Sequence, residues 1–222
     1  MFQSYCLEVK GDYACFTRPE MKVERVSYDV MTPSAARAVF ESILWKPAIR
    51  WVVEKIEVLR PIRWMSIRRN EVGCVVSIRN AETAMKTGGG DLGIYVEEER
   101  QQRAGLVLRD VAYRIYAHFE MTERRGENDH PIKISEMFTR RARNGQCINQ
   151  PYLGCREFPA NFRLIKSYEN NEPPIDETRS LGLMLYDINF GDMEAPVPMF
   201  YKAELVKGVV FVPSPNGSDV IQ

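Results

Sequence analysis

Residues 109–121 read RDVAYRIYAHFEM, and this stretch decides the fold. Its odd positions are all apolar: Val111, Tyr113, Ile115, Ala117, Phe119 and Met121. Strict alternation over this length predicts a strand with one buried face. The other face carries Arg114, Tyr116, His118 and Glu120. It is either an ordinary solvated sheet face or a site built around an acid–base histidine.

Composition is typical of a globular protein with a sizeable core. Of the 222 residues 45% are hydrophobic, which indicates one domain or one domain with an appendage. No apolar run approaches the roughly 20 residues that span a bilayer, so no membrane association is expected. The five cysteines include no Cys-x-x-Cys pair, which favours a reduced, cytoplasmic setting over a zinc site or disulfide framework. We expect Cys147 and Cys155 to serve in packing.

Charge is segregated along a chain whose formal net charge is zero. Residues 167–222 hold nine acidic and three basic residues, so residues 1–166 carry the compensating excess of +6. Two basic clusters stand out: Arg60, Arg63, Arg68, Arg69, Arg79 and Lys86, and then Arg124, Arg125, Lys133, Arg140, Arg141 and Arg143. Such clusters create a local positive field on a neutral molecule, and they suggest a nucleic-acid partner.

The N-terminal part predicts a strand and a helix. Residues 4–10 alternate, and Gly11 is expected to break that strand. Thr32 is a good N-cap with Pro33 at the first helical position. The helix should end before Pro47, because proline disfavours helical geometry at the preceding residue.

Two long strands follow the first helix. In residues 49–59 the apolar phase shifts by one residue, which predicts a bulge near Glu54. Residues 61–76 form a second, strongly basic strand. We interpret residues 80–108 as a mobile insertion, since they contain three consecutive glycines without the Gly-Lys-Ser/Thr of a phosphate-binding loop.

Beyond the central strand the chain predicts a second helix and a β-rich end. His130 is interpreted as a helix-start residue before Pro131, and Asn144-Gly145 as the stop signal. A strand over 161–166 and a linker over 170–174 come next. The last strand-like segments are 181–189, 199–205 and 208–213.

Strand, helix, two strands, helix and strand is the βαββαβ order of ferredoxin-like domains. The prediction is therefore an α+β protein, with a ferredoxin-like domain over residues 1–166 and an antiparallel β-sheet domain over 167–222. The RNA-recognition motif shares this topology, but its consensus string is absent from the sequence.

Four separated strings, in this order, carry a family resemblance: GDYACFTRP at 11–19, ESILWKP at 41–47, AHFE at 117–120 and YLGCREF at 152–158. Together the strings resemble the type I-C form of the fifth-subunit family of CRISPR-associated proteins, in the RAMP superfamily. The resemblance implies metal-independent cleavage of CRISPR precursor RNA at the base of the repeat hairpin. It also implies that the product's 5′ handle stays bound within the Cascade complex.

The resemblance implies a catalytic tyrosine from the first-helix region, with a lysine and a histidine on the central strand. His118 matches the histidine, whereas Leu44 and Ala117 stand at the other two positions. We predict that Tyr116 and Lys46 substitute for them. Histidine can act as acid or base near neutral pH, and a cation stabilises the phosphorane. The predicted RNA contacts are Arg18, Arg68, Arg69, Arg114, Arg140 and Arg143.

No cofactor is expected, and no carboxylate cluster has metal-ligand spacing. The expected partners are the repeat RNA hairpin, mature crRNA and other Cascade subunits, with double-stranded DNA left open. Two alternatives also stay open. The chain could be a non-catalytic handle-binding subunit of the same complex, or an unrelated ferredoxin-like metabolic or regulatory protein.

Overall fold

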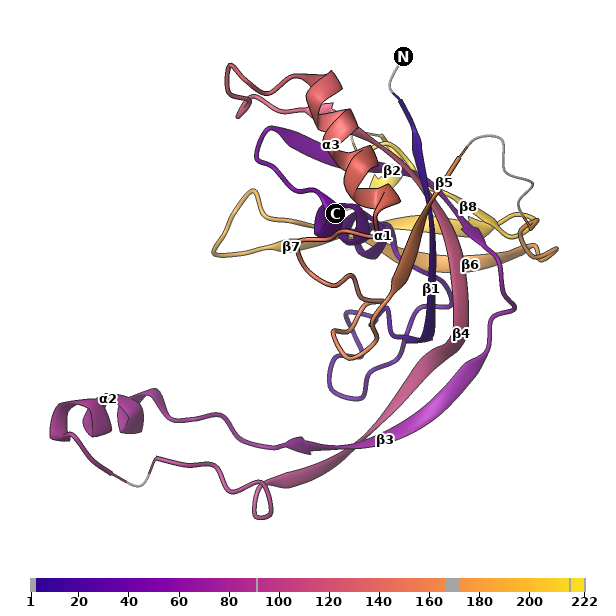
Figure 1. Cartoon of the computed structure of the whole chain (residues 1–222). Helices are drawn as coiled ribbons and strands as arrows, with labels where there is room; N and C mark the ends of the chain where they lie inside the picture. The colour runs from indigo at the N-terminus through magenta and orange to yellow at the C-terminus, as the bar shows by residue number, and fades with distance from the viewer. Residues whose placement is uncertain (1–2, 91, 167–171, 216, 222) are drawn as a thin grey trace.

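The computed structural model describes residues 3–90, 92–166, 172–215 and 217–221. Its main sheet has the strand order β5-β1-β4-β2-β8, with β3 paired to the first half of β4 (Figure 1). The strands of this sheet are β1 (Tyr5–Ala14), β2 (Ile49–Val58), β3 (Trp64–Val72), β4 (Arg100–Met121), β5 (Asn161–Ile165) and β8 (Val209–Phe211). All of these pairings are antiparallel. The prediction of a mixed α and β protein with antiparallel sheets is confirmed.

β4 is the central strand, and its alternation places one face in the core as predicted. Tyr113, Ile115 and Ala117 are buried, with β1 on one side and β2 on the other. The bulge in β2 is also confirmed, because the register with β4 shifts between Val53 and Lys55. Glu54 is the extra residue.

Two helices cover the core face: α1 (Pro33–Ile43) and α3 (Pro131–Arg143). Thr32 caps α1, since its hydroxyl accepts a hydrogen bond from the Ala35 amide. His130 is the N-cap residue of α3, as expected, although its side chain makes no capping hydrogen bond. Phe138 of α3 packs its ring against Trp51, with 4.6 Å between ring centroids. The helices therefore lie against the face that carries Tyr113 and Ile115.

β1 is longer than predicted, because Gly11 does not end it. A Cβ at Gly11 would lie 2.4 Å from Leu153 Cδ1. The glycine therefore serves a close side-chain approach within a continuous strand.

The stretch predicted as an irregular insertion contains regular structure. α2 (Ile78–Thr87) begins at the N-cap Ser77, and β4 already starts at Arg100. β3 and β4 form a long two-stranded arm that extends from the body, with α2 at its far end (Figure 1). The sequence does not predict α2 because this helix has no buried residue and so shows no core-facing pattern. The mobility of residues 80–108 stays a prediction.

The C-terminal part forms a second sheet of β6 (Arg179–Asn189), β7 (Val197–Leu205) and β9 (Val220–Ile221), in the order β6-β7-β9. β8, however, pairs with β2 in the main sheet. Leu181, Met184 and Val210 belong to the same buried cluster as the main core. The two predicted regions therefore share a core. Of the predicted linker, residues 170 and 171 lie outside the described part.

Candidate active site

The face of β4 opposite the helices carries the candidate catalytic groups. Arg114, Tyr116 and His118 lie on this face, next to Glu57, Lys55 and Val52 of β2 in the strand register. A strand holds such side chains at a fixed spacing of about 7 Å between alternate residues. Two of the three predicted catalytic residues, Tyr116 and His118, are thus brought onto one face.

His118 is oriented by the bulge residue of β2. Its Nδ1 lies 2.7 Å from Glu54 Oε1, and the ring is only partly exposed. Glu54 is itself held by the Ser4 hydroxyl, which donates to Oε2 at 2.9 Å, and its carbonyl accepts from the Val212 amide at 3.0 Å. An imidazole that donates from Nδ1 to a carboxylate keeps Nε2 as its basic nitrogen. The arrangement suits proton abstraction at Nε2.

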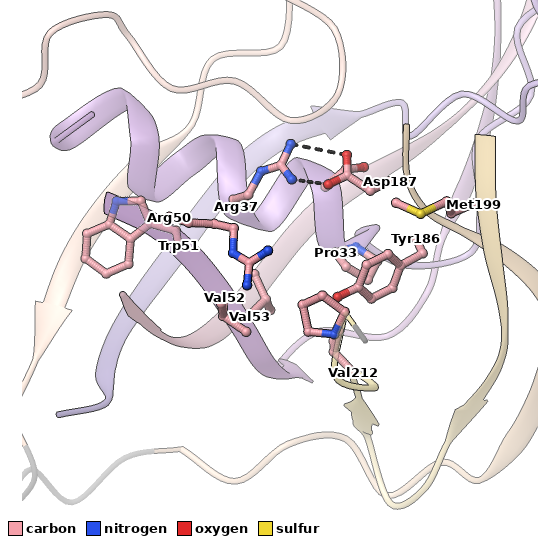
Figure 2. Close-up of a pocket in the computed structure, with 12 residues that line it drawn as sticks. Pro33, Arg37, Arg50, Trp51, Val52, Val53, Tyr186, Asp187, Met199 and Val212 are labelled. Carbon is pink, nitrogen blue, oxygen red and sulfur yellow. Dashed lines mark hydrogen bonds and ion pairs between the residues drawn. The ribbon is translucent and has the colours of Figure 1, made fainter. Parts of the chain in front are cut away.

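A second carboxylate lies on the Nε2 side of His118. Glu120 Oε1 is 3.9 Å from Nε2, and Glu120 Oε2 accepts from Arg50 at 2.7 Å. Arg50 reaches from β2 into a cavity of about 120 Å³ between α1, β2 and β6. On the opposite wall Arg37 of α1 forms a two-pronged ion pair with Asp187 of β6 (Figure 2). The Glu120–Arg50 ion pair therefore lies between His118 and this cavity beside the second sheet.

Tyr116 lies among charged neighbours from β2. Its hydroxyl donates to Glu57 Oε2 at 3.2 Å, and Lys55 Nζ lies 3.9 Å from the centre of its ring. Burial is the main cause that raises the pKa of Tyr116 well above its usual value, and the thiol of Cys6 adds to the effect. The phenol therefore stays protonated at neutral pH. It can donate a hydrogen bond or a proton, but it is a poor base.

Arg114 is buried, although the alternation pattern placed it among the displayed residues. Its exposure is 4% and that of Glu57 is 6%, and Nη1 donates to Glu57 Oε2 at 2.8 Å. Its Nη2 donates to the carbonyl of Glu172, which covers this end of the face. An alternation pattern gives the direction of a side chain, but it does not show that a distant segment lies over it. Arg114 as placed supports the sheet and does not face solvent.

Lys46 does not join the other two candidates. Its Nζ donates to Asp129 Oδ1 at 2.8 Å, just before α3 begins. α3 packs on the core face, whereas His118 lies on the opposite face. Lys55, which contacts the Tyr116 ring, is the lysine that the structure brings to the site.

The other predicted RNA contacts fall into two groups. Arg18 lies over the Tyr28 ring and pairs with Asp29, and Arg69 pairs with Glu157. The second group is solvent-exposed: Arg68 on the arm, and Arg140 and Arg143 on α3. Within the described residues none of these three forms an ion pair. They are the better placed to meet phosphates.

Glu54, Lys55 and Glu57 are the site residues that sequence reasoning missed. The phase shift in residues 49–59 was the available signal, because an extra residue in a strand aims one more side chain at the open face. Only the register between β2 and β4 shows that this side chain meets His118.

Two features are absent from the described residues. No helix among them is long and apolar enough to cross a bilayer. No group of three or more histidine, cysteine, aspartate or glutamate side chains among them is arranged to hold a metal ion.

Comparison with known proteins places these observations in a family context. A family model described as "CRISPR-associated protein (Cas_Cas5)" matches residues 4–213. The curated "CRISPR pre-crRNA endoribonuclease Cas5d" of Mannheimia succiniciproducens is 53% identical over 215 residues, covering 93% of each chain. The protein of the same name from Thermus thermophilus is 39% identical, covering 94% of this chain and 90% of that one.

Solved structures share the fold. A crystal structure titled as a CRISPR-associated protein aligns with a TM-score of 0.71 at 21% identity, covering 100% of this chain and 97% of the other. A chain of a "CRISPR RNA-guided surveillance complex" aligns with a TM-score of 0.56 at 12% identity, covering 96% and 95%. At these identities the likeness concerns the fold alone.

Proposed function

The chain belongs to the CRISPR-associated Cas5 family, and from this membership we propose that it is an endoribonuclease that processes CRISPR precursor RNA. The cut falls at the base of the repeat hairpin and needs no metal. The protein then holds the 5′ handle of the product as a subunit of a type I-C Cascade complex. The observation that carries the catalytic part is the His118–Glu54 pair on an open sheet face.

The strand order supports a ferredoxin-like core for this function. Within the main sheet the order β5-β1-β4-β2, with α1 and α3 as the connecting helices, corresponds to the 4-1-3-2 order of a βαββαβ domain. The arm of β3 and β4 is then an extension of the third core strand. Residues 167–222 add the second sheet.

The proposed chemistry uses the groups on the open face. His118 Nε2 removes the proton from the 2′ hydroxyl, and Glu54 stabilises the imidazolium that results. The 2′ oxygen attacks phosphorus, the bond to the 5′ oxygen breaks, and that oxygen takes up a proton from solvent water. Lys55 and the protonated Tyr116 are placed to stabilise the charge that develops on the phosphorane. The products are a 2′,3′-cyclic phosphate and a 5′ hydroxyl.

A non-catalytic handle-binding subunit is the second candidate. It is favoured by Lys46, the one predicted catalytic cation, which is held at Asp129 on the helix side of the sheet. Under this alternative His118 only contacts the handle. Duplex DNA is a further proposed ligand of the exposed arm arginines, and a binding titration with a labelled duplex tests it.

The deciding experiment incubates the purified chain with its cognate repeat hairpin in EDTA. A single cut that is lost when the 2′ hydroxyl at the cut position is replaced by hydrogen supports the proposal. An uncut RNA that still binds tightly would establish the handle-binding subunit instead. Failure of both cleavage and binding would overturn both candidates.

A further inference from the structure

Two cysteines 140 positions apart lie side by side, away from the sheet face described above. Cys15 follows the last residue of β1, and Cys155 lies in the loop between α3 and β5. Cys155 Sγ is 3.7 Å from the Cys15 carbonyl oxygen, and the Cys15 amide donates to Leu153 at 3.0 Å. The Cys15 thiol lies 3.5 Å from the Thr17 hydroxyl, and the Cys155 thiol lies 3.7 Å from Nη1 of Arg25. Packing, the role expected for Cys155, therefore does not describe its surroundings fully.

The backbone holds the two residues in this arrangement. Gly154 has a φ of +83°, and a Cβ there would lie 2.0 Å from the Cys15 carbonyl oxygen. Only glycine allows so close an approach of the loop to the end of β1. The two cysteines are therefore neighbours because the main chains that carry them meet.

The charges around the pair make the two thiols unequal. The neighbouring Cys15 thiol is the largest cause that lowers the pKa of Cys155, to about 6, and the Cys155 thiol in turn raises the pKa of Cys15. Arg25 Nη1 lies 3.7 Å from Cys155 Sγ and acts in the same direction, whereas Glu157 opposes it. Cys155 is partly exposed and Cys15 is fully buried. Thiolate character with access to solvent marks a reactive cysteine.

We propose that Cys15 and Cys155 form a reversible disulfide, a thiol-based oxidation site at the end of β1 opposite the 151–160 loop. The oxidant class is a peroxide. The Cys155 thiolate attacks one peroxide oxygen, the O–O bond breaks, and a sulfenic acid and hydroxide form. Cys15 sulfur then attacks the Cys155 sulfur, the S–O bond breaks, and the hydroxyl leaves as water with the Cys15 proton.

The other described cysteines serve as internal controls. Burial raises the pKa of Cys6 to about 11, and the pKa of Cys74 is also raised. Cys147 follows the end of α3, in the loop before Pro151. Like Cys15 and Cys155, all three are free thiols in the structure. A general sensitivity to oxidation would modify them as readily as Cys155.

The test treats the purified full-length chain with hydrogen peroxide, near equimolar, and follows its intact mass. We expect a loss of two hydrogen atoms that dithiothreitol reverses, and a proteolytic peptide pair joined through Cys15 and Cys155. Cys155→Ser should abolish the bridge, whereas Cys147→Ser should keep it. An unchanged mass, a bridge through other cysteines, or irreversible oxidation of Cys155 with Cys15 still reduced would overturn the proposal.

A second experiment compares the alkylation rates of the thiols, and it does not require the disulfide to form. Iodoacetamide below one equivalent should alkylate Cys155 first at pH 7, with a rate that rises through about pH 6. Cys15 and Arg25 lower the pKa of Cys155 to that value, although Glu157 acts to raise it. Arg25→Gln should move that midpoint to higher pH, and Arg25→Lys should restore much of it. Preferential alkylation of Cys6 or Cys147 would count against the assignment.

Discussion

The two halves of β4 meet solvent in opposite ways. In the half from Val111 to Met121 the strand pairs with β1 up to Ala117 and with β2 from Tyr113 onward. Its polar groups are matched with partners from β2, such as Glu54 for His118 and Glu57 for Arg114. From Arg100 to Val107 its strand partner is β3, with one isolated bridge from Leu106 to Val26, and Arg68 and Arg100 on that arm are exposed. Within the described part of the chain these two arginines form no ion pair. The paired half suits chemistry that needs fixed geometry, and the arm suits contacts that depend on charge.

The largest expected effect concerns His118 in the paired half. His118→Ala should lower single-turnover cleavage in EDTA by about 10²–10⁴-fold, because a proton-transfer group acts mainly in the transition state. Hairpin affinity should stay within a few-fold. His130→Ala, at the start of α3, is the matched control and should cleave normally. Cleavage by His118→Ala at the wild-type rate would contradict a catalytic role for His118.

Glu57 tests whether the paired half depends on its buried charges. Glu57→Gln leaves Arg114 buried without its carboxylate, which should cost about 3–5 kcal/mol of unfolding free energy. Glu120→Gln breaks the more exposed pair with Arg50 and should cost less than about 1 kcal/mol. Urea titrations of both variants measure the difference. Equal losses would mean that burial does not distinguish the two pairs.

Tyr116 is expected to contribute less than His118. Tyr116→Phe removes one hydroxyl hydrogen bond and should slow cleavage about three- to tenfold, as expected for an interaction of ~1 kcal/mol. Leu44→Ala should lower stability by about 2–5 kcal/mol, since Leu44 is 1% exposed, but leave the cleavage rate of the folded protein unchanged. Rates measured well below the melting temperature separate the two. A slower Leu44→Ala would reverse this assignment.

The smallest effect concerns the arm. Arg68→Gln with Arg100→Gln should weaken hairpin binding only a few-fold at moderate salt. If both arginines contact phosphates, the log–log salt dependence should become shallower by about 0.7–0.9 per contact. Arg140→Gln with Arg143→Gln, on α3, provides the comparison. An unchanged slope in the arm variant together with a shallower one in the α3 variant would place the RNA path along the helix.

Local patterns in the sequence predicted the parts of this molecule that local rules govern. Alternation gave β4, the cap signals gave α1 and α3, and the phase shift gave the bulge at Glu54. What the sequence could not show depends on segments far apart in the chain. Arg114 is buried because Glu172 returns over it, and Gly11 is tolerated in β1 because Leu153 packs against it.

In the candidate site, too, local patterns predicted some residues, whereas others depend on segments far apart in the chain. His118 and Tyr116 were found from their strand face, whereas their partners Glu54 and Lys55 required the register between β2 and β4. Lys46 was placed by nearness in sequence to the helix end, and its ion pair with Asp129 lies on the other side of the sheet.

The bulge residue Glu54 is one that the strand β2 does not need for its own alternation. If Glu54 were removed, Val53, Lys55 and Ile56 would follow one another in unbroken alternation, and Ile56 and Val58 would keep their places in the core. β2 could therefore lose Glu54 and still present the same residues to the core. The extra position supplies the carboxylate that holds the His118 ring, so a single-codon deletion would remove the bulge and that carboxylate together.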